Sequence, residues 1–156
     1  MTVAGCEFCD GDGGAVIFRA AKWRALRVTG ADGEAYRGYC RVVWNTHVKE
    51  LTDLDSDDRD EFMRAVFAVE GALRASLSPH KMNVASLGNL TPHLHWHVIP
   101  RYADDPAFPK PVWAQPLPAQ FAGQIDKLGA QESRPAETET DRGDWEKAVR
   151  LALESV

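Results

Sequence analysis

The segment that most constrains this chain is HLHWHVI, residues 93–99, in which three of the five histidines alternate with apolar residues. Successive side chains of a β-strand point to opposite faces, so this pattern predicts a strand with one histidine face and one apolar face. The apolar face, formed by Leu94, Trp96 and Val98, is expected to pack on a hydrophobic core. The fold must therefore contain a sheet that packs one side on the core and carries the three histidines on the other side.

The other hydrophobic patterns predict an α+β fold, an antiparallel sheet with one long helix and a C-terminal helix. A long helix is expected to begin at Ser56 as its N-cap, with acidic residues in its first turn, and to end before Pro79. A final helix is predicted over 145–153. Further strands are predicted over residues 15–20, 23–28, 39–44 and 81–87, with a turn at 29–34 and a tight loop at 88–92.

A chain of 156 residues predicts one domain, whose main part is residues 1–105. Residues 106–156 are expected to be an arm and a C-terminal helix that pack on or extend this domain. Five of the nine prolines lie between Pro106 and Pro118, which favours an extended arm over more sheet.

The formal net charge of −5 and the absence of a basic run argue against binding to nucleic acid or to an anionic membrane. The sequence has no long apolar stretch that predicts a membrane span and no signal-peptide pattern at its start. Three cysteines do not make a disulfide framework. A cytoplasmic protein that binds a small molecule is the expectation.

The histidine face of the 93–99 segment needs a chemical explanation, because three adjacent imidazoles are poor core material. One such histidine would ordinarily be a hydrogen-bonded structural residue, but three in strict alternation favour function. One interpretation is a metal site on all three. The other interpretation gives each histidine a different role: one attacks a substrate, one manages protons or charge, and one is held for structure. Alternate strand residues lie roughly 6–7 Å apart, so three converge poorly on one ion, and this favours divided roles.

A second feature is the cysteine pair of CEFC, Cys6 and Cys9. Two small buried residues near a strand would be the unremarkable interpretation. The alternative is half of a metal site, with His47 as a third ligand and one histidine of residues 93–97 as the fourth. A set of two cysteines and two histidines suits zinc. Cys40 is expected to be buried in its strand.

Residues 93–99 resemble the signature of the histidine triad superfamily, and the resemblance extends from about Cys6 to about Arg101. The segment GYCRVVWNTHV resembles a strand and loop that end in a histidine, and CEFC lies where many members carry a cysteine pair. The resemblance implies an α+β homodimer that acts on nucleotides. Members include phosphoramidases, diadenosine and other dinucleoside polyphosphate hydrolases, and related nucleotidyl transferases.

The resemblance also implies a role for each residue. His95 would attack the α-phosphorus and become transiently nucleotidylated, while His97 would contact the phosphate oxygens or the leaving group. A structural zinc would be held by Cys6, Cys9, His47 and His93. The expected substrate-binding residues are Asn83, Gly88, Asn89, Thr91 and Arg101.

Three departures from the family pattern bear on substrate and rate. Tyr39 stands where many members have a histidine, Asn89 replaces a frequent glutamine, and Leu90 replaces a frequent serine. Two other hypotheses therefore stay open. One is a nucleotide-binding regulatory module with little turnover, and the other is a metalloenzyme whose metal sits on the three histidines.

Overall fold

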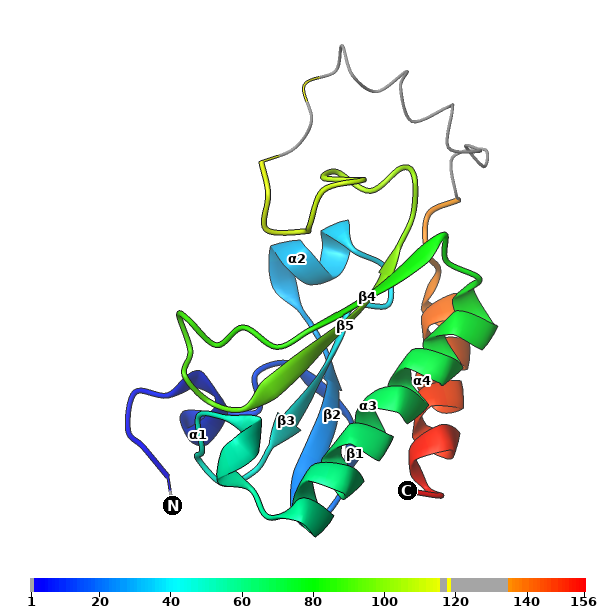
Figure 1. The fold of residues 1–156 in the computed structure, drawn as a ribbon. Coiled ribbons are helices and arrows are strands. Elements are labelled where there is room, and N and C mark those ends of the chain that lie inside the picture. Colours follow the sequence, from blue (N-terminus) through cyan, green and yellow to red (C-terminus); the bar gives the residue numbers. More distant parts are fainter. Residues whose placement is uncertain (1, 116–117, 119–134) are drawn as a thin grey trace.

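The computed structural model describes residues 2–115, 118 and 135–156 and has the predicted α+β architecture. Five strands form one antiparallel sheet in the order β1-β2-β3-β5-β4 (Figure 1). The elements are α1 (Glu7–Asp10), β1 (Ala15–Arg19), β2 (Trp23–Arg27), α2 (Gly30–Ala35), β3 (Cys40–Trp44), the short 3₁₀ helix η1 (Leu51–Asp53), α3 (Ser56–Leu77), β4 (Lys81–Ala85), β5 (His95–Arg101) and α4 (Glu139–Leu153).

The main hydrophobic core lies between the sheet and α3, which crosses one face of the sheet. The N-cap of α3 is Asp55 rather than the predicted Ser56, because the Asp55 carboxylate accepts a 2.9 Å hydrogen bond from the Asp58 amide. Cys40 is buried in its strand, as expected. The helix buries one stripe at helical spacing, formed by Phe62, Ala65, Val66, Val69 and Leu73.

Helix α4 packs beside α3 and against β1, so the C-terminal part of the chain joins the same helical layer (Figure 1). It begins at Glu139, earlier than predicted. Thr138 and Asp141 form a capping box there, in which each side chain accepts a hydrogen bond from the backbone amide of the other residue. Its buried residues are Trp145, Val149 and Leu153.

The opposite face of the sheet carries a second, smaller core, which includes Phe8 of α1, Tyr36 and Tyr39. Two predictions on this side are wrong. The segment predicted as a turn over 29–34 forms the helix α2. Residues 106–115 are not extended but fold into successive turns, because proline favours the second position of a turn, as Pro106 does where the Phe108 amide binds the Asp105 carbonyl.

Residues 116, 117 and 119–134, within the segment predicted as an arm and a C-terminal helix, lie outside the described residues. Within the part of the chain that is described, no helix has the length and apolar character needed to cross a bilayer.

Candidate functional site

The backbone separates His93 from the other two histidines of the 93–99 segment. β5 begins at His95, so the prediction of one strand that includes His93 is wrong. The His93 amide donates to the carbonyl of Thr91 at 2.8 Å, which forms a tight bend just before the strand. His95 and His97 keep the predicted common face, opposite Val43 and Arg41 of β3. The backbone therefore sets His93 apart from His95 and His97.

His93 belongs to a cluster with Cys6, Cys9 and His47, whose candidate ligand atoms all lie within 4.8 Å of one another. Nδ1 of His93 is 3.3 Å from Sγ of Cys6 and 3.6 Å from Sγ of Cys9, and Nδ1 of His47 is 3.4 Å from Sγ of Cys9. A tetrahedral ion with bonds of about 2.0–2.3 Å holds its ligands roughly 3.5 Å apart. The four side chains therefore fit one tetrahedral metal ion.

The other ring nitrogen of His93 prepares it as a metal ligand. Nε2 donates to the carbonyl of Trp44 at 2.6 Å, so the lone pair of the neutral ring is on Nδ1, which faces the cysteines. Burial lowers the pKa of His93, which favours this neutral form. A backbone carbonyl that accepts from the second nitrogen is the usual partner of a metal-binding histidine.

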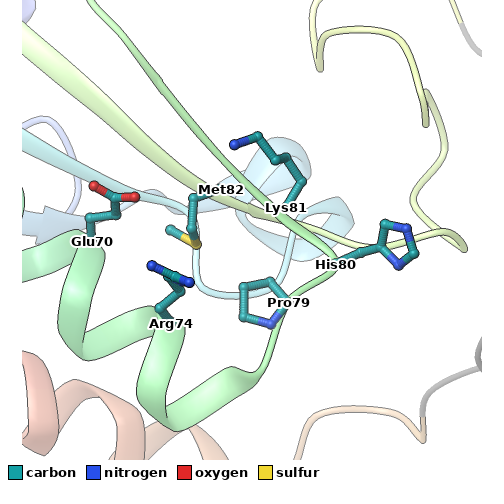
Figure 2. Close-up of a pocket in the computed structure, with 6 residues that line it drawn as sticks. All are labelled: Glu70, Arg74, Pro79, His80, Lys81 and Met82. Carbon is teal, nitrogen blue, oxygen red and sulfur yellow. The ribbon is translucent and has the colours of Figure 1, made fainter.

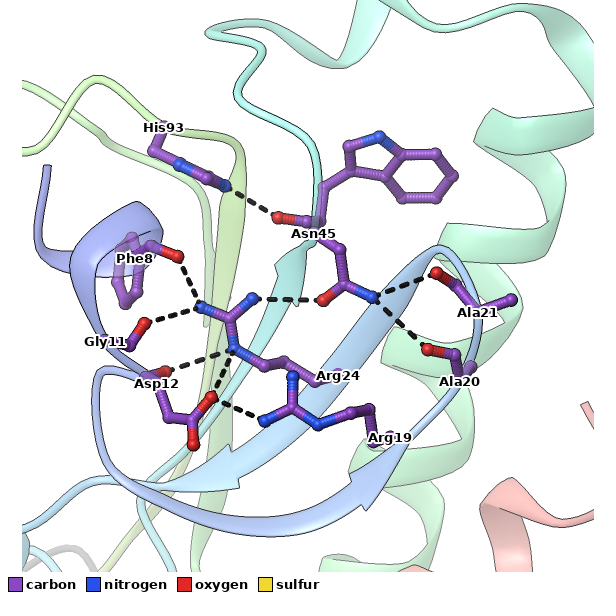
Figure 3. Close-up of polar contacts among 10 residues, drawn as sticks. Phe8, Gly11, Asp12, Arg19, Ala20, Ala21, Arg24, Asn45 and His93 are labelled. Atoms are coloured by element: carbon purple, nitrogen blue, oxygen red, sulfur yellow. Dashed lines mark hydrogen bonds and ion pairs between the residues drawn. The ribbon is translucent and has the colours of Figure 1, made fainter. Parts of the chain in front are cut away.

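Arg24 of β2 holds the turn that carries both cysteines, and the sequence analysis did not identify it. The side chain is only 3% exposed and donates to the carbonyls of Phe8 (2.9 Å), Gly11 (3.4 Å) and Asp12 (3.2 Å), as Figure 3 shows. A further bond of 3.0 Å reaches Oδ1 of Asn45. Because a guanidinium presents five donors in a fixed fork, one side chain can fix several carbonyls of an irregular turn.

His95, His97 and Tyr39 form a chain of hydrogen bonds whose direction can be deduced. Nδ1 of His95 lies 2.6 Å from the carbonyl of His93, which can only accept, so this nitrogen carries the proton of the neutral ring. Nε2 of His95 then bears the lone pair and accepts from Nε2–H of His97 at 3.1 Å. Nδ1 of His97 must in turn accept, and its partner is the Tyr39 hydroxyl at 2.8 Å.

The environment keeps both of these histidines neutral. Burial lowers the pKa of His95, and burial together with the neighbouring His95 and Arg41 lowers the pKa of His97 to about 3. Each of the two residues is only 5% exposed. The site therefore presents a neutral imidazole whose Nε2 lone pair is held in place, which is the form that acts as a nucleophile.

Aromatic rings pack against both histidines. The Phe8 ring centre is 4.8 Å from that of His95, and the Trp113 ring centre is 5.3 Å from that of His97. Trp113 comes from the segment of turns that follows β5, and this segment is tied to the domain by the Tyr36 hydroxyl, which donates to the carbonyl of Val112 at 3.3 Å. The segment predicted as an arm that packs on or extends the domain thus contributes to the surroundings of the site.

The residues predicted to bind substrate fall into two groups. Gly88, Asn89 and Thr91 lie in the loop that leads into His93, with Gly88 at a positive φ of 69°. Asn83 and Arg101 instead contact each other, since Nη1 of Arg101 donates to Oδ1 of Asn83 at 2.8 Å. Arg101 is buried, and its Nε also pairs with Asp105 at 3.0 Å.

Arg41 is the second residue near the site that the sequence analysis did not identify. It lies directly opposite His97 in the β3–β5 pairing. A signal was present in the strand CRVVW, where one charged residue interrupts an apolar run on the face shared with Tyr39 and Val43. Which strand would pair with it was not evident from the sequence.

The fifth histidine, His80, lies away from both clusters. It precedes β4, whose first residue, Lys81, pairs with Arg101 at the far end of β5 from His95. Figure 2 shows the neighbouring pocket, which lies between the end of α3 and the start of β4 and is lined partly by Glu70 and Arg74. The His80 ring is exposed and packs edge-on against Phe108 at 5.6 Å, so it offers a control position for the other histidines.

Comparisons with known proteins identify the family and the fold. A family model described as the HIT domain matches residues 28–104. The chain is similar to the structure of a histidine triad protein from Bradyrhizobium japonicum, with 27% identity, a TM-score of 0.66 and coverage of 91% of this chain and 92% of that one. A histidine triad protein from Marinobacter aquaeolei VT8 has 22% identity, a TM-score of 0.65 and coverage of 92% and 90%.

A third similar structure, a histidine triad protein from Sinorhizobium meliloti 1021, has 26% identity, a TM-score of 0.57 and coverage of 74% of this chain and 90% of that one. No curated protein matches the chain.

Proposed function

Because the chain belongs to the histidine triad family, we propose that it is a nucleotide hydrolase or transferase that acts at an α-phosphate through His95. One observation carries this proposal. Because Nδ1 of His95 donates to the carbonyl of His93, Nε2 carries the lone pair and is the reactive atom. The substrates we favour are dinucleoside polyphosphates such as diadenosine polyphosphates, or nucleoside phosphoramidates.

The reaction would proceed in two displacements at the same phosphorus. Nε2 of His95 forms a bond to the α-phosphorus, and the bond from phosphorus to the leaving group breaks, so that the leaving group takes the electron pair. Water then attacks the nucleotidyl-histidine, and the phosphorus–nitrogen bond breaks in turn. Nε2–H of His97, which donates to His95 in the resting site, becomes free to donate to a phosphoryl oxygen.

The loop residues Gly88, Asn89 and Thr91 are proposed to bind the phosphate through backbone and side-chain donors. Asn83 and Arg101 are proposed to support the same substrate region. We assign residues 1–105 to the catalytic part and residues 106–156 to an arm and a C-terminal helix that pack on or extend it. Trp113 of the arm packs against His97.

Cys6, Cys9, His47 and His93 are proposed to hold a structural zinc ion, which would cross-link the N-terminal turn to the start of the histidine strand. This cross-link has a consequence for His95. The ring of His95 donates to the backbone carbonyl of His93, and the proposed zinc site holds the side chain of His93. The ion would therefore help to fix the orientation of His95.

A regulatory module with little turnover is the second candidate, favoured by Tyr39 in place of a histidine and by the nearly closed site. A screen of adenosine and guanosine phosphoramidates and of dinucleoside polyphosphates separates the two. Turnover of at least one of these compounds supports an enzyme. Tight binding of a compound, with no turnover of any member of the set, supports a regulator.

On a substrate that the wild type cleaves, His95→Ala should lower kcat by at least about 1,000-fold, as expected for loss of a covalent nucleophile. His97→Ala should slow the reaction yet leave some transfer to His95, and His80→Ala should match the wild type. Mass spectrometry of protein denatured after brief mixing should find nucleotide on the peptide that contains His95. Near-native turnover by His95→Ala would disprove the nucleophile assignment and favour a metal on the histidines.

A further inference from the structure

Arg41 places a positive charge beside the two proposed reacting histidines. Its guanidinium carbon is 5.7 Å from the ring centre of Phe8 and 5.9 Å from that of Tyr39. These are the rings that contact the histidines, since Phe8 packs on His95 and Tyr39 on His97. The cation thus lies against the same two rings that pack on the proposed reacting histidines, and its residue is directly opposite His97 in the sheet.

The hydrogen bonding of Arg41 is incomplete. Nε is buried and has no hydrogen-bond partner. Its charge is paired with Oε1 of Glu7 at 3.4 Å, through Nη1. The side chain of Arg41 is 16% exposed, whereas that of Glu7 is 51% exposed. A buried N–H without an acceptor is costly, and a half-exposed carboxylate at this distance is a weak and replaceable partner.

A phosphoryl group at His95 would need a source of positive charge, because both histidines are neutral. In the hydrogen-bond chain of the site, each ring has one N–H and one accepting nitrogen, so the histidines supply one lone pair and one N–H but no net charge. Guanidinium groups suit phosphoryl oxygens because they present several N–H donors in one plane.

We propose that Arg41 is a phosphate-binding residue of this site, and that Glu7 is its counter-ion, which the phosphate of a nucleotide displaces. The inference rests on the proposed function and adds a specificity-determining residue to it. The proposal predicts opposite effects on phosphate binding from substitution of Arg41 and of Glu7. Loss of Arg41 removes an attraction for the phosphate, whereas loss of the Glu7 charge removes a competitor and a repulsion.

The test is calorimetric titration of the full-length protein with AMP and, separately, with adenosine, which lacks the phosphate. Arg41→Gln should weaken AMP binding by about 10-fold or more, the size expected for a charge-assisted hydrogen bond. Glu7→Gln should tighten AMP binding by about 3-fold, which is less because the carboxylate is largely exposed. Neither variant should change the affinity for adenosine.

Two substitutions with the same changes in charge serve as controls. Arg19→Gln removes an arginine of β1 that pairs with Asp12 on the protein surface, and Glu34→Gln removes an exposed carboxylate of α2. Both should bind AMP within about 2-fold of the wild type, since exposed charges at a distance are screened. Thermal unfolding of every variant checks that each is folded.

An alternative role for the Arg41–Glu7 pair is to hold α1 on the sheet. In that case both substitutions would lower stability, and any loss of affinity would be shared by AMP and adenosine. The phosphate-binding role is overturned if Arg41→Gln binds AMP as the wild type does, or if Glu7→Gln binds AMP more weakly. Failure of the wild type to bind AMP would instead overturn the proposed function, and this inference with it.

Discussion

The Tyr39 hydroxyl determines which nitrogen of His97 carries the proton, because it donates to Nδ1 at 2.8 Å. Tyr39→Phe should release this constraint, so that part of the His97 population places its proton on Nδ1 and leaves Nε2 without one. We expect kcat to fall by about 10-fold or more and stability to fall by about 1–2 kcal/mol, the cost of one buried acceptor without a partner.

Nitrogen NMR of the imidazole rings distinguishes the two forms of His97 directly. Tyr36→Phe is the matched control, since this buried tyrosine of the same small core donates to a backbone carbonyl and not to a histidine. An unchanged His97 spectrum in Tyr39→Phe would contradict the assigned direction of the hydrogen-bond chain.

The low pKa of His97 makes stability depend on pH. The folded protein holds the residue neutral down to about pH 3, because of burial first and then the nearby His95 and Arg41, whereas the unfolded chain takes up its proton near pH 6.5. Its contribution to stability is therefore complete above about pH 6.5 and is lost progressively as the pH falls toward 3.

Chemical denaturation between pH 7 and pH 4.5 should show a falling free energy of unfolding. His97→Gln should have a slope that is shallower by up to about 1.4 kcal/mol per pH unit. The two proteins must carry the same metal content in this comparison. Equal slopes would show that His97 is protonated in the folded protein as readily as in the unfolded chain.

At the scale of elements, β2 positions the metal cluster through Arg24, which binds carbonyls of α1 and of the residues just after it, the segment that carries Cys6 and Cys9. Arg24→Met should leave several carbonyls and Asn45 without a donor, lower stability by about 2–4 kcal/mol and weaken zinc binding by roughly 10–100-fold. Competition with a chromophoric chelator measures the affinity, and metal analysis should find about one zinc per wild-type chain.

Arg27→Met is the control for this substitution. Arg27 lies at the end of the same strand, but its side chain pairs with Glu146 of α4 at 2.7 Å and not with the segment that carries Cys6 and Cys9. It should retain wild-type zinc affinity. If both variants lose affinity equally, the effect of Arg24 is on the sheet as a whole and not on the turn that carries the ligands.

For the whole molecule, we predict a homodimer, as the family resemblance implies. Several large apolar side chains have substantial exposure, including Leu87 at 50%, Leu90 at 96% and Trp113 at 50%, and contact with a second chain would cover apolar surface of this kind. An obligate interface is occupied at a protein concentration of about 10 µM. Light scattering at this concentration should give twice the mass of the 17.3 kDa chain. A monomer under these conditions would contradict the prediction.

Local patterns in the sequence determined the elements that depend on neighbouring residues. The alternation after His95 placed His95 and His97 on one face of a strand, and the spacing of Phe62, Val66, Val69 and Leu73 predicted α3. Both follow from burial of one face of a regular backbone, which leaves a period in the sequence. The order of the cysteine pair, His47 and the three histidines, read through the family resemblance, predicted which four residues would meet.

The tertiary structure alone decided what depends on contacts between distant or irregular segments. The bend at His93 lies between the hydrogen bond of its amide to Thr91 and the backbone bonds of Leu94 to Trp44 and Val48. The turns after Pro106 bring Trp113 to His97. Arg24 and Arg41 look alike as charged residues within apolar strands. Arg24 contacts the segment that carries the cysteines, whereas Arg41 lies opposite His97, because each strand pairs with particular neighbours. Such pairings depend on chain closure and side-chain packing over the whole domain, and no local period encodes them.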